Sequence, residues 1–119
     1  MDQQSILRMK HMMPKALAYL QLISLEAFID ELKRRSLYEA RLSDWIQRRD
    51  MFEHRKLRLT ALDPTHGLIL RYEIVYYQGL AVYSETEELK KSREEAKRRI
   101  AERLEAEGIR LLEGEYHTG

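Results

Sequence analysis

The basic side chains of this sequence are concentrated in two segments, and cations at that density are what phosphate groups bind. Residues 33–60 hold nine Lys and Arg against four acidic residues, and residues 90–103 hold seven against three. Such cations release counterions from a nucleic-acid backbone when they contact its phosphates. However, the formal net charge is only +1, and solvated helix surfaces carry similar charge runs. On charge alone, a solvated surface is favoured over a phosphate-binding face.

Other kinds of chemistry have little support in the sequence. The four histidines lack the short spacing of a metal site and there is no cysteine, so we expect no metal centre and no disulfide. No Gly-rich phosphate loop or nucleophile elbow occurs, so we expect no enzyme and no cofactor. No apolar run reaches the ~18 residues of a membrane span, and the first residues lack a secretory pattern. We therefore expect a cytoplasmic protein without membrane association.

Two strands and a turn are predicted in the middle of the chain. Residues 55–62 alternate between apolar and polar side chains, and residues 68–77 are rich in aromatic and branched ones, as is typical of strands. Between them, the segment 63–67 predicts a turn, because Pro fixes φ and Gly permits a positive φ. A tight hairpin turn at 78–79 is expected to lead into a short third strand at 80–83.

Helices are expected on both sides of these strands. The stretch Ser92–Leu104, SREEAKRRIAERL, combines strong helix formers with a narrow stripe of small apolar residues. Its helix begins there or as early as Ser84, because both positions fit a capping box, and it ends at Gly108. A second helix is predicted at 37–51. Residues 109–116 form either an extra strand or a packed tail.

The segment 16–32 is dense in apolar residues that spread over more than one face of a helix. A helix apolar on two sides must be covered on two sides. This predicts a homodimer through residues 16–32, and a central core helix is an equally good interpretation. The basic cluster after it, 33–36, predicts a helix end. We therefore divide the chain into an N-terminal helical extension, 1–35, and a domain, 36–119.

The order over residues 37–107, one helix, three antiparallel strands and one helix, resembles the double-stranded RNA-binding domain. In that family the second helix begins Ser-Lys-Lys-x-Ala-Lys, and SREEAKRRIAERL stands at the matching place. The family's Gly-Pro-x-His turn is similar to Asp63-Pro64-Thr65-His66, and EIVYYQGLAVY resembles its second strand and turn. The resemblance implies an α+β fold of the order α-β-β-β-α, a three-stranded antiparallel sheet with its helices on one face.

The resemblance also implies an RNA site made of three regions on one face. Proteins of this family bind an A-form duplex through its shape, its 2′-hydroxyls and its phosphates. By position, the first helix would supply Arg41, Gln47 and Arg48. The turn would supply Pro64, Thr65 and His66. The last helix would supply Lys90, Lys91, Arg93 and Lys97.

Two functional hypotheses follow. The first is non-catalytic binding of double-stranded or structured RNA through the basic helix face and the turn. The second is a protein-interaction module, a dimeric adaptor or regulatory subunit of a larger assembly, because the segment 16–32 is so apolar and the net charge so low. Some members of the family pair with proteins in this way.

Overall fold

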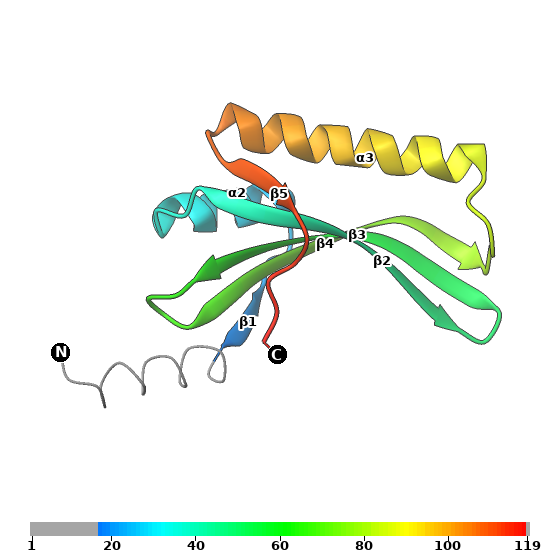
Figure 1. Cartoon of the computed structure of the whole chain (residues 1–119), viewed down its shortest axis with the longest axis horizontal. Coiled ribbons are helices and arrows are strands. Elements are labelled where there is room, and N and C mark those ends of the chain that lie inside the picture. The colour runs from blue at the N-terminus through cyan, green and yellow to red at the C-terminus, as the bar shows by residue number, and fades with distance from the viewer. Residues whose placement is uncertain (1–16, 119) are drawn as a thin grey trace.

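The structure, a computed structural model, describes residues 17–118 and forms one mixed sheet with two helices (Figure 1). The elements in chain order are β1 (Ala18–Gln21), α2 (Leu25–Arg34), β2 (Glu39–Arg49), β3 (Phe52–Asp63), β4 (Leu68–Leu80), α3 (Glu87–Ala106) and β5 (Arg110–Glu113).

The sheet has five strands in the order β1-β4-β3-β2-β5. Its centre is the antiparallel meander of β2, β3 and β4, while β1 lies parallel to β4 and β5 lies parallel to β2. The predicted α-β-β-β-α order, with a three-stranded antiparallel sheet and an N-terminal helical extension, is therefore wrong. Parallel edge strands need long connections, and here α2 and α3 stand within those connections.

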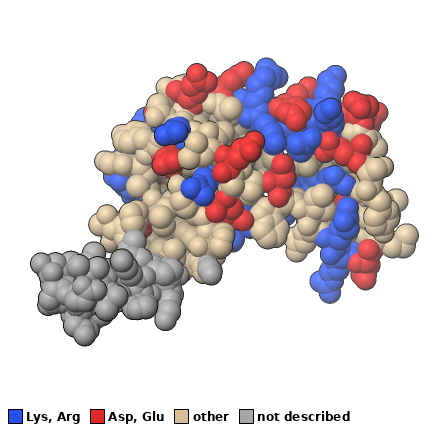
Figure 2. Space-filling view, in the orientation of Figure 1, with Lys and Arg blue, Asp and Glu red and all other residues tan. Residues whose placement is uncertain are grey.

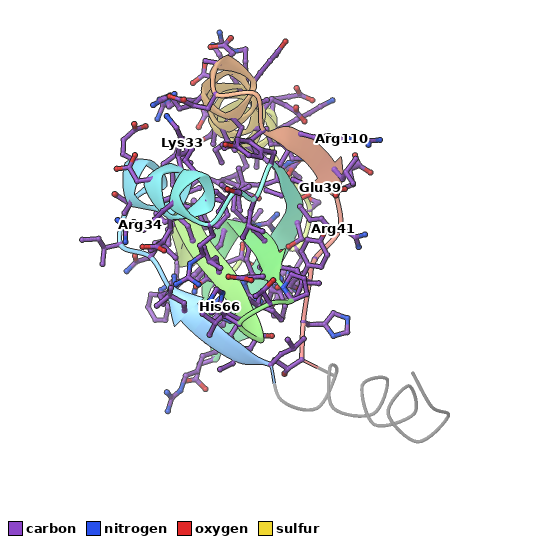
Figure 3. All side chains as sticks on the ribbon, turned by 90° about the vertical axis from the view of Figure 1, so that its left-hand side faces the viewer. Lys33, Arg34, Glu39, Arg41, His66 and Arg110 are labelled. Atoms are coloured by element: carbon purple, nitrogen blue, oxygen red, sulfur yellow. The ribbon has the colours of Figure 1, made fainter. Side chains whose placement is uncertain are left out.

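The core lies between the sheet and the two helices, which cover the same face (Figure 3). β3 alternates along its length, so that Leu57, Leu59 and Ala61 are buried toward the helices. α2 contributes its most buried side chains, Phe28, Ile29 and Leu32, and α3 contributes Leu89, Ala96, Ile100 and Leu104. Three residues of the stripe predicted for α3, Ala96, Ile100 and Leu104, are thus buried in the core as expected.

The predicted helix at 37–51 is wrong, because this segment is β2. Its apolar residues fit both a helix and a strand. Leu42 and Ile46 are four residues apart, a spacing that places them on one face of a helix and also on one side of a strand. Pairing decides the outcome, since β3 bonds to residues 41–49 and β5 bonds to residues 39–42. Tertiary contacts override a helical pattern of this strength.

The predicted helix at 16–32 is also wrong. β1 ends at Gln21, and α2 begins only after Ser24, whose side chain accepts a hydrogen bond from Ala27 N at 3.0 Å. The apolar residues therefore belong to two elements that pack into a single core, so one helix with two apolar sides does not exist. The premise of a dimer through residues 16–32 is removed. Residues 1–16 lie outside the described part.

The strands at 55–62 and 68–77 and the turn between them are confirmed by β3, β4 and their antiparallel pairing. However, the hairpin turn expected at 78–79 is wrong, because β4 continues to Leu80 and pairs there with Phe52. The last helix is capped by Thr86, whose hydroxyl accepts from Leu89 N at 3.1 Å. Its end at Gly108, with φ of 72°, is confirmed.

Candidate nucleic-acid interface

One face of the sheet carries no helix from residues 17–118, and we call it the open face. Its side chains come from alternate residues of each strand, which the register arranges in rows across the sheet. Successive rows on β2, β3 and β4 are Arg41, Thr60 and Arg71; Ser43, Arg58 and Glu73; Trp45, Lys56 and Val75; Gln47, His54 and Gln78; and Arg49, Phe52 and Leu80.

The C-terminal residues cross the middle of the open face from β5 toward β1 (Figure 1). Glu115 accepts a hydrogen bond from Arg58 at 2.7 Å and one from Trp45 Nε1 at 3.3 Å. Tyr116 N donates to Thr60 Oγ1 at 3.0 Å, and Thr118 N donates to Tyr19 OH at 3.4 Å. This tail, residues 114–118, covers the proximal half of the open face, the half near β1, β5 and the 63–67 turn.

The described residues leave the distal half of the open face, which ends at the β2–β3 turn, uncovered except where Glu115 reaches Trp45 Nε1. We define the platform as its last three rows, nine residues that include no carboxylate. Four are apolar and at least two-fifths exposed: Trp45 (40%), Val75 (45%), Phe52 (60%) and Leu80 (59%). The others are the basic residues Arg49, His54 and Lys56 and the amides Gln47 and Gln78.

Arginines beside the platform stack on aromatic rings. The Arg58 guanidinium lies 3.9 Å from the centre of the Trp45 ring, and Arg41 lies 4.4 Å from that of Tyr116. Arg58 is also held by Glu73 at 2.7 Å. Cation–π contact and two carboxylates fix this guanidinium, so the indole of Trp45 has a rigid support beneath it.

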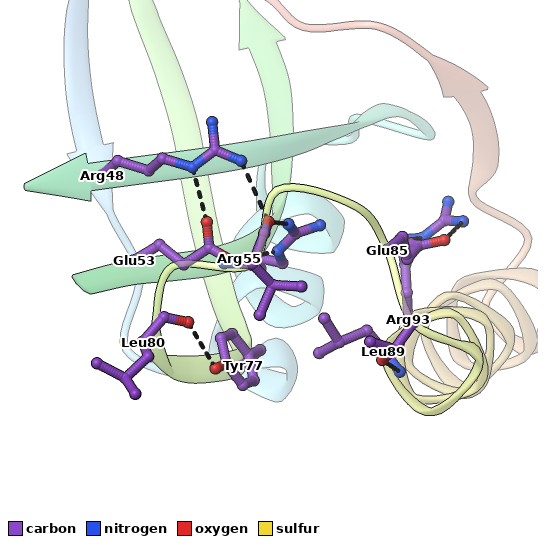
Figure 4. Close-up of polar contacts among 10 residues, drawn as sticks. Arg48, Glu53, Arg55, Tyr77, Leu80, Glu85, Leu89 and Arg93 are labelled. Carbon is purple, nitrogen blue, oxygen red and sulfur yellow. Dashed lines mark hydrogen bonds and ion pairs between the residues drawn. The ribbon is translucent and has the colours of Figure 1, made fainter. Parts of the chain in front are cut away.

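A buried ion cluster fixes the distal end on the helix side of the sheet (Figure 4). The Glu53 carboxylate accepts hydrogen bonds from Arg55 Nε and Arg48 Nε at 2.8 Å and from Val82 N at 3.0 Å. Burial alone would raise the pKa of Glu53, but these three bonds outweigh it and lower the pKa to about 2. Glu53 is therefore ionised, and it ties the connection between β4 and α3 to the sheet.

The 63–67 turn is braced in a similar way at the proximal end. Asp63 accepts from Arg35 at 2.9 Å, and His66 Nδ1 lies 2.8 Å from the same Asp63 oxygen. Burial would raise the pKa of Asp63, but the hydrogen bonds from Arg35 and His66 lower it. His66 is thus a turn residue with a structural partner, while Pro64 and Thr65 are exposed beside it.

Acidic residues accompany the cations of α3. Arg93 bonds to Glu85 at 2.9 Å, and Lys97 lies 3.5 Å from Asp44. Lys90 and Lys91 are exposed. Figure 2 shows Lys and Arg interspersed with Asp and Glu over this helix, so the outer surface of α3 is a mixed charge surface and not a uniform cationic face.

The structure does not bring the three predicted contact regions together. Arg41 and Gln47 lie on the open face, whereas Arg48 is on the helix side in the Glu53 cluster. The turn and the start of α3 stand at opposite ends of the molecule (Figure 1). Of the nine platform residues, only Gln47 was among the predicted contacts. One signal in the sequence points to the others. Aromatic, basic and amide side chains fill every second position of 45–49 and 52–56, and a helix assignment over 37–51 hides that period.

Comparison with known proteins finds no matching family model, no matching curated protein and no matching solved structure. Among residues 17–118, no helix is long and apolar enough to cross a membrane. The same residues contain no cluster of three or more metal-binding side chains.

Proposed function

We propose that the protein binds structured RNA that carries unpaired bases, and that the platform is the binding surface. The observation that supports this most is the composition of the platform, in which exposed aromatic and basic side chains alternate without a carboxylate. Base stacking on aromatic side chains contributes about 1–3 kcal/mol per base, and basic residues nearby neutralise phosphates.

Each class of platform residue has a task in this proposal. Trp45 and Phe52 present ring surface to unstacked bases, and they stand in rows that are two apart on the sheet. Lys56 and Arg49 lie in those same rows and receive phosphates. Gln47 lies in the row between them and offers a donor and an acceptor to a base edge. An exposed sheet surface suits splayed single strands better than the deep groove of an A-form duplex.

The test is fluorescence anisotropy with a labelled RNA hairpin that has an unpaired loop, a blunt RNA duplex and single-stranded DNA, each at two salt concentrations. Lys56→Glu is compared with Lys91→Glu, a matched change of an exposed lysine on α3. We expect Lys56→Glu to weaken hairpin binding about tenfold or more and to reduce the salt slope by about 1, while Lys91→Glu changes neither. Equal losses in both variants, or no binding at low salt, would contradict the proposal.

A protein partner is the second candidate, because the distal end is apolar beyond the platform as well. Met51, which precedes Phe52, is 70% exposed. Tyr83, three residues after Leu80, is 84% exposed, and the Arg48 guanidinium lies 5.4 Å from its ring centre. Apolar groups clustered at one end are typical of interaction surfaces. A photo-reactive amino acid at position 80 separates the two candidates in cells, since it links to RNA in the first and to a protein in the second.

A further inference from the structure

Half of β2 has no neighbour on its outer edge among the described residues. β5 pairs with residues 39–42 only, while β2 continues to Arg49 (Figure 1). The chain leaves that edge at Gly114, whose φ of 115° suits glycine, and it turns onto the open face. The segment 43–49, which we call the β2 edge, is therefore a strand of seven residues paired on one side only.

The direction of the free backbone groups on the β2 edge follows from β5. Arg110 N donates to Tyr38 O, and Gly114 N donates to Leu42 O. The even-numbered residues of β2 therefore present their backbone groups outward, so Asp44, Ile46 and Arg48 carry the free N–H and C=O groups. Open edges of this kind are templates for another strand.

The opposite edge of the sheet is protected. β4 extends beyond β1 in the same way, but its register with β3 shifts between Arg55 and Lys56, so the strand bulges at Tyr76. Bulges prevent regular pairing with an incoming strand. β2 has no such shift from Arg41 to Arg49 and contains no proline there. Of these two long edges, only the β2 edge is regular.

We propose that the β2 edge pairs with the same edge of a second copy of this chain, antiparallel and two-fold symmetric about Ile46. In this register Ile46 meets Ile46 of the copy, and Asp44 lies opposite Arg48 on both sides of the axis. The three outward residues of each chain then close about six hydrogen bonds. Ile46 is 43% exposed, so the pairing also covers apolar surface.

Charge favours this register over those centred on the other two outward residues. An axis at Asp44 would place two carboxylates opposite each other, and an axis at Arg48 would place two guanidinium groups opposite each other, which is unfavourable. With the axis at Ile46, both charges find opposite partners. Asp44 is 45% exposed and Arg48 is 42% exposed at the side chain, although each has an ion-pair partner in its own chain. Both are therefore accessible to the copy.

The pairing also has the right length. With Ile46 on the axis, Ser43 lies opposite Arg49 of the copy, so all seven residues are used. The copy's β2 ends at its Arg49, and its β2–β3 turn begins beside Leu42, the last residue of β2 that pairs with β5. Because the axis is perpendicular to the sheet, both pairs of helices lie on one side, and the two platforms lie together on the other. This inference does not depend on what the platform binds.

Sedimentation velocity of the full chain over a range of concentrations tests the proposal. We expect the mass to rise from one chain to two, and Ile46→Asp, which puts two carboxylates on the axis, to keep the mass at one chain. Val75→Asp is the matched control, because Val75 is also β-branched and 45% exposed but lies on β4. It should still dimerise. A wild-type protein that stays at one chain, or equal losses in both variants, would overturn the proposal.

A cross-linking experiment gives a second measurement with minimal change to the fold. The chain has no cysteine, and opposed Cα atoms in a hydrogen-bonded antiparallel pair are about 5.5 Å apart, within the range of a disulfide. Ile46→Cys should therefore form a disulfide-linked dimer under mild oxidation, much faster than Gln78→Cys on β4. Equal rates, or no linked dimer from Ile46→Cys, would refute the pairing.

Discussion

The two halves of the sheet are built from the same three long strands, yet they differ in everything that surrounds them. The proximal half is widened by β1 and β5, covered by α2 on one face and crossed by the tail on the other. Within residues 17–118, the distal half is three strands wide and its platform carries no covering element. Phe52 and Leu80 in the distal half are more than half exposed, whereas Phe28 in the proximal core is fully buried. Stability and recognition are therefore located in different halves.

The largest effect that would test this division is the loss of a proximal core side chain. Phe28→Ala should lower the free energy of unfolding by about 3–5 kcal/mol, because a large ring is removed from a site without room for water. Val75→Ala in the distal half should change it by less than about 1 kcal/mol, as is usual for exposed sites. Urea unfolding measures both. Similar losses in the two variants would show that the halves are not energetically distinct.

The Glu53 cluster is the exception in the distal half, and pH should reveal it. The pKa of Glu53 is about 2 in the folded chain, against its usual value of 4.5. A lowered pKa stabilises the fold above the unfolded value, and this contribution is lost as pH falls from about 4.5 to about 2. We therefore expect the thermal midpoint to fall across this window, and to fall less in Glu53→Gln, which has no carboxylate to protonate. Parallel pH curves for the two proteins would contradict this assignment.

Removing the stacking surface of the platform should affect binding and not folding. Trp45→Ala should weaken binding of the RNA hairpin by about 1–3 kcal/mol, which is about five- to 150-fold, and Trp45→Phe should restore most of it. Anisotropy measures the affinity and urea unfolding checks the fold. If Trp45→Ala lowers the free energy of unfolding as well as the affinity, Trp45 has a structural role like that of the proximal core residues.

The smallest effect is expected from the tail, which marks the border between the halves. A chain that ends at Gly114 exposes Arg58 and Thr60 and loses the Glu115 carboxylate from the open face. Hairpin affinity should rise by about three- to fivefold, in line with the loss of one competing hydrogen-bonded contact of about 1 kcal/mol. Glu115→Gln should give part of the gain. An unchanged affinity would show that RNA contacts only the distal half.

The predictable parts of the fold were those specified by local signals. The alternation in β3 and β4, the turn at Asp63–Gly67 and the glycine at the end of α3 all report structure within a few residues. The Ser24 cap ahead of Phe28 and Ile29 was a readable start for α2, although the dense apolar run around it obscured it. Thr86 was likewise a readable cap for the start of α3, but Ser84 and Ser92 competed with it as candidate caps.

The rest depended on partners that are distant in sequence. β2 carries a helix-compatible pattern, and only its pairing with β3 and β5 makes it a strand. The platform could not be found without that correction, because side chains on alternate residues share a face only in a strand. Arg48 and Arg93 were predicted to contact RNA from their positions in the family resemblance, but position in the sequence does not show that Glu53 and Glu85 already hold them.

The two parallel edges have a consequence for the order in which the chain folds. Ala18 pairs with Leu68, 50 residues later, and Glu39 pairs with Arg110, 71 residues later. Contacts across such separations form late, because a long loop must close first, whereas the hairpins of the meander close locally. During synthesis, the described part of the chain therefore gives β2 no strand on its outer side until residues 110–113 leave the ribosome.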